Sequence, residues 1–159
     1  MGVSIMRCGY GLVLALAAAG LAAPAWADDA APRNVYLSAQ FPGDVGMDVL
    51  PPVDPDRTES PTASLDLANL GDTPATWQAD PNCAIAWTVT DPSGAVIDQS
   101  AACAPGTPET KTLNSGQQLQ DSAVTPLHVF KYQEGTKYTV HFTYFGIKTD
   151  ADFTIHHEQ

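Results

Sequence analysis

The chain has 159 residues, a formal net charge of −11 at pH 7 and 44% hydrophobic residues. A chain this acidic repels nucleic acid and anionic lipid surfaces, so we exclude partners of those two kinds. The length suffices for one domain with its own core, and no apolar run after the N-terminal region is long enough to span a membrane.

Residues 1–27 have the features of an export signal. A basic residue precedes the apolar run 11–23, and Ala25-Trp26-Ala27 forms a small-x-small cleavage site. We expect cleavage before Asp28, which leaves residues 28–159 as a single domain with no membrane insertion after cleavage. The alternative is an uncleaved anchor, which the short apolar run disfavours. The signal type indicates a periplasmic or secreted bacterial protein.

Alternation of apolar and polar residues dominates the mature chain. It is seen in the segments 35–41, 63–68, 85–90, 138–145 and 153–156. A period of two is typical of half-buried strands, and no segment after the signal has the period of an amphipathic helix. Thirteen prolines and twelve glycines interrupt these strands at short spacing. The sequence therefore predicts an all-β fold, an antiparallel β-sandwich of about 7–9 strands.

One stretch, residues 42–61, departs from the alternation. It contains five prolines and five acidic residues. Proline removes the backbone donor that a central strand needs, so this stretch is not a central strand. We expect a long, acidic, partly extended loop, and connections of that length are either functional or mobile.

The segment Asp91-Pro92-Ser93-Gly94 has the composition of a type I turn followed by a left-handed glycine, which makes a three-residue hairpin loop with a bulge. Such a turn sets Asp91 opposite Ala95. Continued by steps of two, this register predicts the pairs Val89 with Ile97, Trp87 with Gln99, Ile85 with Ala101 and Cys83 with Cys103.

The two cysteines of the mature chain lie equidistant from Ser93, because Cys8 is removed with the signal. Opposed residues on neighbouring strands are close enough for a disulfide, and an exported chain meets oxidising conditions. We therefore expect Cys83 and Cys103 to form a disulfide that closes the open end of the hairpin. If the strands bulge before they reach the cysteines, the disulfide holds a loop instead of a ladder.

A second marker of the fold is the pattern Tyr132, Gly135, Tyr138 ahead of an alternating strand. It is the arrangement of a tyrosine corner, in which the phenol hydroxyl bonds to the backbone upstream. The pattern is typical of immunoglobulin-like sandwiches, and its role is structural.

Several short stretches together carry a resemblance to a known family. In chain order they are residues 65–71, 73–76, 87–91 with Gly94, 113–116 and 135–140, with Cys83 and Cys103 between them. Over about residues 62–142 the chain resembles the intracellular proteinase inhibitor (BsuPI) domain family. The resemblance implies an immunoglobulin-like sandwich and a serine protease as the protein partner. It assigns no binding residues, and this chain departs from it in the export signal, in the long acidic segment 42–61 and in the C-terminal extension that ends in residues 156–159.

The four histidines are His128, His141, His156 and His157. His141 and His156 lie on two strands that could pair as the last hairpin, where two imidazoles could bind copper or zinc. Surface positions on the polar face of each strand are the simpler interpretation. We therefore assign no metal ligand and expect no cofactor.

Two tryptophans of the mature chain, Trp77 and Trp87, are candidate contact residues. Trp87 falls on the predicted core face, whereas Trp77 follows Pro74 in a short segment and is the better candidate for an exposed contact, although burial is the commoner outcome for such a residue.

No G-x-S-x-G, P-loop or H-E-x-x-H motif occurs in the sequence, and we assign no catalytic residue and expect no enzyme. Three hypotheses remain: an exported protein-binding domain with proteinase-inhibitor activity of the BsuPI type, a structural or assembly module of the bacterial envelope, and a periplasmic metal-binding protein.

Overall fold

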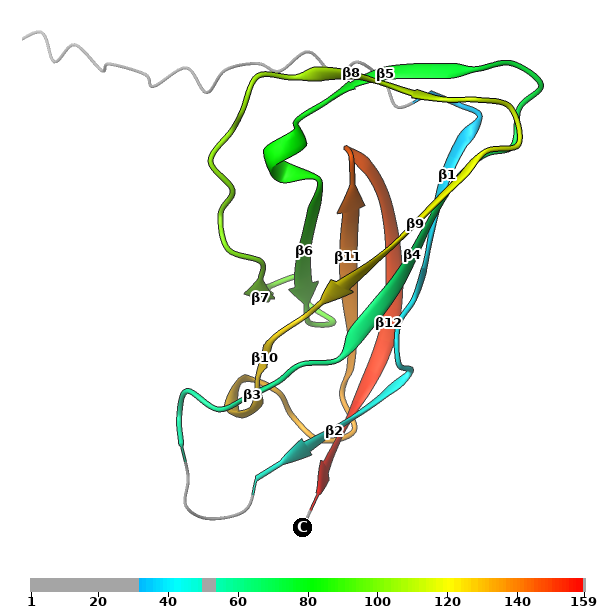
Figure 1. Ribbon diagram of the computed structural model, residues 1–159. Helices are drawn as coiled ribbons and strands as arrows, with labels where there is room; N and C mark the ends of the chain where they lie inside the picture. Colours follow the sequence, from blue (N-terminus) through cyan, green and yellow to red (C-terminus); the bar gives the residue numbers. More distant parts are fainter. Residues whose placement is uncertain (1–31, 50–53, 159) are drawn as a thin grey trace, which may run out of the picture.

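Figure 1 shows the computed structural model of the chain, which describes residues 32–49 and 54–158. The predicted export signal, residues 1–27, lies outside the described residues. In the ranges 32–49 and 54–158, no helix is long and apolar enough to cross a membrane.

The chain folds as an all-β, immunoglobulin-like sandwich of two main sheets (Figure 1). The first sheet has the order β1 (Val35–Gln40), β4 (Thr62–Asn69), β9 (Gln118–Val124). The second has the order β2 (Asp44–Asp48), β12 (Ile147–Glu158), β11 (Lys137–Tyr144), β6 (Ile85–Thr90), β7 (Val96–Gln99). Neighbouring strands are antiparallel except β2 and β12, which are parallel. Of the twelve strands in residues 32–49 and 54–158, eight lie in these two sheets, which is within the predicted range of 7–9 for the sandwich.

Two short strand pairs and two 3-10 helices complete the described chain. β5 (Ala75–Ala79) pairs with β8 (Glu109–Leu113), and β3 (Thr58–Glu59) pairs with β10 (Leu127–His128). The helices are η1 (Pro81–Cys83) and η2 (Val129–Lys131).

The core lies between the two sheets and confirms the alternation seen in the sequence. Leu65, Leu67, Val140, Phe142 and Phe153 are fully buried, and each lies on the predicted apolar face of its strand. Both tryptophans are buried as well. The indole Nε1 of Trp77 donates a hydrogen bond of 2.8 Å to the carbonyl of Phe145, so the exposed contact considered for Trp77 is not formed.

Residues 42–61 are not one long loop. Asp44–Asp48 form the edge strand β2, parallel to the end of β12, and Val45 and Met47 point into the core. The proline argument excluded a central strand, but it does not exclude an edge strand flanked by prolines. Residues 50–53 of the predicted loop lie outside the described residues.

The turn at residues 91–94 has the predicted geometry. The amide of Asp91 bonds to the carbonyl of Ala95 at 3.0 Å, and Gly94 has a φ of +84°. The Asp91 Oδ1 atom accepts hydrogen bonds from the backbone amides of Ser93 and Ala95 and from the Ser93 hydroxyl, which fixes the turn.

The predicted register beyond the turn is wrong by one residue. Thr90 pairs with Val96, but Val89 pairs with Asp98, so β7 carries a bulge at Ile97. The pairing of Trp87 with Gln99 and of Ile85 with Ala101 is therefore not formed: Thr88 pairs with Gln99, and the carbonyl of Trp87 accepts from the Ser100 amide. The bulge directs the Asp98 side chain into the protein, where its carboxylate accepts hydrogen bonds from His128, Lys131 and Tyr132.

The predicted disulfide is formed between Cys83 and Cys103, with a Cα–Cα distance of 5.6 Å. Cys83 ends η1 and Cys103 lies in an irregular segment, because the ladder of β6 and β7 ends at Thr88 and Gln99. The disulfide therefore holds two loops together, which is the alternative that the sequence left open.

The tyrosine corner is confirmed. The hydroxyl of Tyr138 accepts a hydrogen bond of 2.9 Å from the amide of Gln133. Gly135 has a φ of +72°, and its amide bonds to the carbonyl of Ile155 on β12. The corner thus joins the start of β11 to the neighbouring strand.

Replacing both cysteines by serine should lower the free energy of unfolding by about 3 kcal/mol, because the disulfide closes a loop with a sequence separation of 20. Urea unfolding followed by tryptophan fluorescence measures this difference. The unsubstituted protein in a reducing agent is the control and should match the double variant. Equal stabilities with and without the disulfide would contradict the expectation.

Candidate functional site

The structure does not pair His141 with His156, the two histidines that the sequence suggests as metal ligands. His141 on β11 lies opposite Asp150, whereas His156 lies beside Gly46 of β2, beyond the end of the β11–β12 pairing. In the part of the chain that the structure describes, no group of three or more histidine, cysteine, aspartate or glutamate side chains could hold a metal ion.

Each histidine instead contacts one carboxylate. The pairs are His128 with Asp98 at 2.8 Å, His141 with Asp150 at 2.7 Å, His156 with Asp44 at 3.1 Å and His157 with Glu134 at 4.0 Å. Three of the four carboxylates are more than half exposed, and Asp98 is the buried exception.

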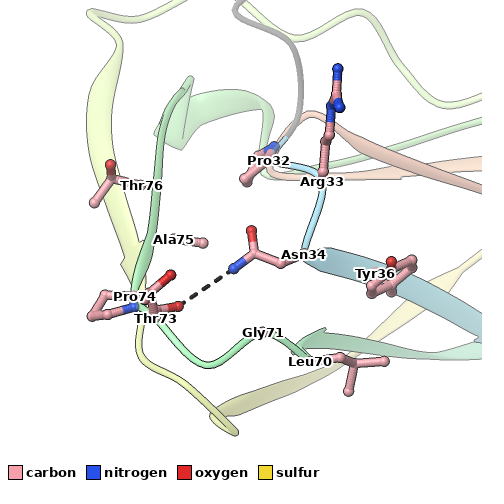
Figure 2. Close-up of a pocket in the computed structure, with 10 residues that line it drawn as sticks. All are labelled: Pro32, Arg33, Asn34, Tyr36, Leu70, Gly71, Thr73, Pro74, Ala75 and Thr76. Atoms are coloured by element: carbon pink, nitrogen blue, oxygen red, sulfur yellow. Dashed lines mark hydrogen bonds between the residues drawn. The ribbon is translucent and has the colours of Figure 1, made fainter.

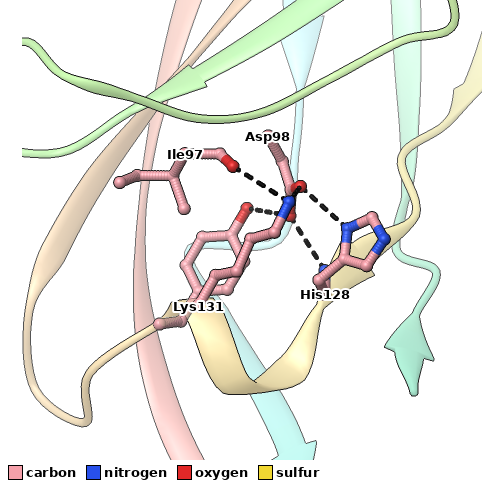
Figure 3. Close-up of polar contacts among 5 residues, drawn as sticks. Ile97, Asp98, His128 and Lys131 are labelled. Atoms are coloured by element: carbon pink, nitrogen blue, oxygen red, sulfur yellow. Dashed lines mark hydrogen bonds and ion pairs between the residues drawn. The ribbon is translucent and has the colours of Figure 1, made fainter. Parts of the chain in front are cut away.

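Asp98 is the centre of a polar cluster that joins β7 to β10 and η2 (Figure 3). Its side chain is 3% exposed. Its carboxylate accepts hydrogen bonds from the His128 amide (2.9 Å), Lys131 Nζ (2.6 Å) and the Tyr132 hydroxyl (3.0 Å), and its Oδ1 atom lies 2.8 Å from His128 Nδ1. Four donors satisfy both oxygens of a buried carboxylate, so the cluster fixes the bulge of β7.

The electrostatics of the cluster follow from these contacts. Burial by itself raises the pKa of the Asp98 carboxyl, but the hydrogen bonds from Lys131, His128 and Tyr132 outweigh burial and hold its pKa below the ordinary value of 3.8. Burial and the Asp98 charge raise the pKa of Tyr132 far above its ordinary value. Asp98 is therefore a stable anion, and this cluster has a structural role.

A surface hollow lies at the end of the sandwich where β1 begins and β4 ends (Figure 2). It has a volume of about 630 Å³, and its lining comes from residues 32–36 and 70–76. Figure 2 shows Leu70 and Tyr36 on one side of the hollow and Thr73 and Pro74 across from them.

The loop of residues 69–74, which we call the Asn69 loop, is held by one buried side chain. Asn69 is fully buried at the end of β4. Its Nδ2 atom donates to the carbonyls of Thr73 (2.9 Å) and Leu113 (2.8 Å), and its Oδ1 atom accepts from the Gly71 amide (2.9 Å) and Asn34 Nδ2 (2.9 Å). A side-chain amide can make four hydrogen bonds, and Asn69 makes all four.

Further contacts fix the backbone of the Asn69 loop. The Leu70 amide donates to the Asn34 carbonyl at 2.9 Å, and the Ser115 hydroxyl donates to the Gly71 carbonyl at 2.8 Å. A Cβ atom at Gly71 would lie 2.6 Å from Asn34 Nδ2, so glycine is required for this close approach.

Two large apolar side chains remain exposed on this fixed backbone. Leu70 is 68% exposed and Tyr36 is 55% exposed. Tyr36 lies opposite Ala68, one position from the end of β4, which places it near Leu70. We call Tyr36, Leu70 and the Asn69 loop the docking surface. Tyrosine is enriched among the anchors of protein interfaces, and Leu70 adds exposed apolar area on the same ordered backbone.

The sequence did not identify this site. Residues 69–71 belong to a stretch that resembles the family, but the resemblance assigns no binding residues. One signal was present: Asn69 follows Ala63, Leu65 and Leu67 at the same spacing of two, so a polar amide occupies a core position of the strand. A buried amide needs hydrogen-bond partners, which indicates a structured loop next to it.

Comparison with known protein families and with curated proteins finds no match to this sequence. Similar solved structures include an alkylpurine DNA glycosylase of Pseudomonas fluorescens, with 14% identity and a TM-score of 0.41 over 77% of this chain and 30% of that chain. They also include a β-glucosidase from Listeria innocua, with 13% identity and a TM-score of 0.41 over 78% of this chain and 16% of that chain. A β-glucuronidase of Bacteroides uniformis has 14% identity and a TM-score of 0.35 over 76% of this chain and 13% of that chain. The chain spans less than a third of each protein, and similarity at this level carries no argument about function.

Asp98→Asn should lower stability by about 2 kcal/mol at neutral pH, because the added amide hydrogens face the donors of His128 and Lys131. The difference should also depend on pH. The pKa of Asp98 is lower in the folded chain, so its contribution is complete above the ordinary value of 3.8 and is lost as the pH falls through the folded pKa.

Urea unfolding of both proteins between pH 7 and pH 2 measures this dependence. Glu109→Gln is the matched control, since Glu109 is an exposed carboxylate outside the cluster. A stability difference that stays constant down to the lowest pH would contradict the assignment of a stabilising Asp98 anion.

Proposed function

We propose that this chain is an exported protein-binding domain that binds a partner protein through the docking surface. The observation that carries the proposal is Leu70, a large apolar side chain that is 68% exposed on a backbone fixed by the four hydrogen bonds of Asn69. A loop that is ordered before binding loses less conformational entropy on association, so more of its contact energy appears as affinity.

The chemistry of the docking surface favours a protein over a small molecule. The hollow is open, and its edges carry Tyr36 and Leu70, while Arg33 and Asn34 supply polar groups nearby. Interfaces between proteins combine an apolar centre with polar groups at the rim, and tyrosine and arginine are enriched there.

Export to the periplasm or the medium is part of the proposal. The disulfide between Cys83 and Cys103 supports it, because stable disulfides belong to oxidising compartments outside the cytoplasm. The predicted signal in residues 1–27 supports it independently.

We further propose a serine protease as the partner and inhibition of the BsuPI type as the activity. Two features support this choice: the resemblance of residues 62–142 to that family, and the fixed Asn69 loop, since a protease inhibitor must present a rigid loop to the enzyme. The Asn69 loop lies within the resembling stretch. A structural or assembly module of the envelope would use the same docking surface for a partner that is not a protease.

Inhibition of subtilisin-like and trypsin-like proteases by the purified mature domain at micromolar concentration tests the proposal. Leu70→Glu should weaken inhibition by about 30-fold or more, because a central apolar anchor contributes about 2 kcal/mol or more. Val96→Glu is the matched control, since Val96 is 57% exposed on β7, outside the docking surface, and this variant should inhibit like the unsubstituted domain.

The outcomes separate the hypotheses. If no protease is inhibited, the inhibitor hypothesis is wrong, and capture of envelope proteins with the unsubstituted domain and with Leu70→Glu tests the module hypothesis. A partner retained by the first and lost by the second supports the docking surface. Equal binding by Leu70→Glu and the unsubstituted domain contradicts it.

A further inference from the structure

The outer face of the second main sheet brings together three side chains that the docking surface does not use. They are Thr90 on β6, His141 on β11 and Asp150 on β12, three adjacent strands of the sheet. His141 lies directly opposite Asp150, and Thr90 lies on the other side of β11, opposite Thr139, which is two residues from His141 along the strand. Side chains so related on one face of a sheet are within reach of each other.

The hydrogen bonds run in one line through the imidazole ring. His141 Nδ1 lies 2.7 Å from Asp150 Oδ1, and His141 Nε2 lies 2.9 Å from Thr90 Oγ1. An ionised carboxylate only accepts hydrogen bonds, so in the neutral ring Nδ1 carries the hydrogen and Nε2 is the acceptor. The Thr90 hydroxyl therefore donates to Nε2.

This is the order of groups that activates a hydroxyl nucleophile: a carboxylate orients an imidazole, and the imidazole accepts the hydroxyl proton. His141 differs in this respect from the other three histidines, whose described ring contacts are with a carboxylate. A hollow of about 540 Å³ is lined in part by His141 and Asp150, but Thr90 is not among its lining residues.

We propose that Thr90 is an acyl-acceptor site that reacts with small activated esters. In the step, the Thr90 oxygen forms a bond to the acyl carbon while its proton passes to His141 Nε2. The ester bond to the leaving oxygen breaks, the leaving group departs with the electron pair, and His141 returns the proton to it or to water. The product is an acyl ester of Thr90.

The backbone around Thr90 sets the outcome of this step. Thr90 pairs with Thr139 on one side and with Val96 on the other, so its strand is engaged in ladders on both sides. Two free backbone amides are what stabilise the oxyanion in hydrolases with high turnover. We therefore expect one acylation event and a persistent acyl-threonine, not rapid turnover.

Incubation of the purified protein with p-nitrophenyl acetate tests the proposal, with peptide mass spectrometry as the readout. We expect an acetyl group on Thr90, accompanied by a burst of about one equivalent of p-nitrophenolate. His141→Gln should slow acetylation of Thr90 by about 100-fold, which is the contribution of a positioned general base. Thr90→Val should remove the label altogether.

Thr112→Val is the matched control, because Thr112 is an exposed threonine on β8, which pairs with β5 and lies outside the sheet that carries His141. This variant should acetylate Thr90 at the unsubstituted rate. Circular dichroism of each variant establishes that the fold is kept. Acetyl groups found on lysines and on the amino terminus but not on Thr90, or an unchanged rate in His141→Gln, would overturn the proposal.

Discussion

The end of the sandwich that carries the docking surface depends on one buried side chain, the amide of Asn69. Its four hydrogen bonds reach the start of β1, the turn after β4, the segment before β5 and the end of β8. Its backbone also pairs with the β8–β9 turn, through Gln117 and Gly116. Loss of the Asn69 amide would leave the Leu113 carbonyl, its fully buried partner, without this hydrogen bond, which is unfavourable by about 1–3 kcal/mol. The four segments are therefore held in one arrangement, and Leu70 is exposed as a consequence.

Asp98 has the same structural role in the region of β7, β10 and η2, where its carboxylate holds these segments together. Both groups are buried, both are saturated with partners, and each joins segments that are distant in the sequence. The core between them is almost entirely apolar and defines the sandwich without fixing its loops. Buried polar networks that are fully satisfied restrict a chain to one arrangement, whereas apolar packing tolerates several. The two networks thus account for ordered loops at positions where composition alone predicts irregular structure.

Much of the scaffold could be predicted from the sequence because its causes are local. Alternation identified the long strands, the residues of the 91–94 turn determined its geometry, and Gly135 with Tyr138 identified the corner. The bulge at Ile97 could not be predicted, since it depends on donors from His128 and Lys131, which lie about 30 residues away.

The strand β2 and the candidate sites were missed for a related reason. β2 pairs with the end of β12, which lies more than 100 residues later in the sequence. The alternation of buried and exposed residues within 44–48 is short, and Pro42 and Pro51 on either side of it favoured the interpretation as a loop. The Asn69 loop and the line of Thr90, His141 and Asp150 each combine side chains from three or more segments, so neither leaves a motif in the sequence.

Hydrogen exchange of the Asn69 loop tests the central claim most directly, because the claim is that the loop is ordered before any partner binds. The Leu70 amide bonds to the Asn34 carbonyl and the Gly71 amide to the Asn69 side chain. We predict that both amides exchange as slowly as the paired amides of β4, since they open only when the Asn69 network opens. Exchange at the rate of an unstructured loop in the free protein would contradict the account.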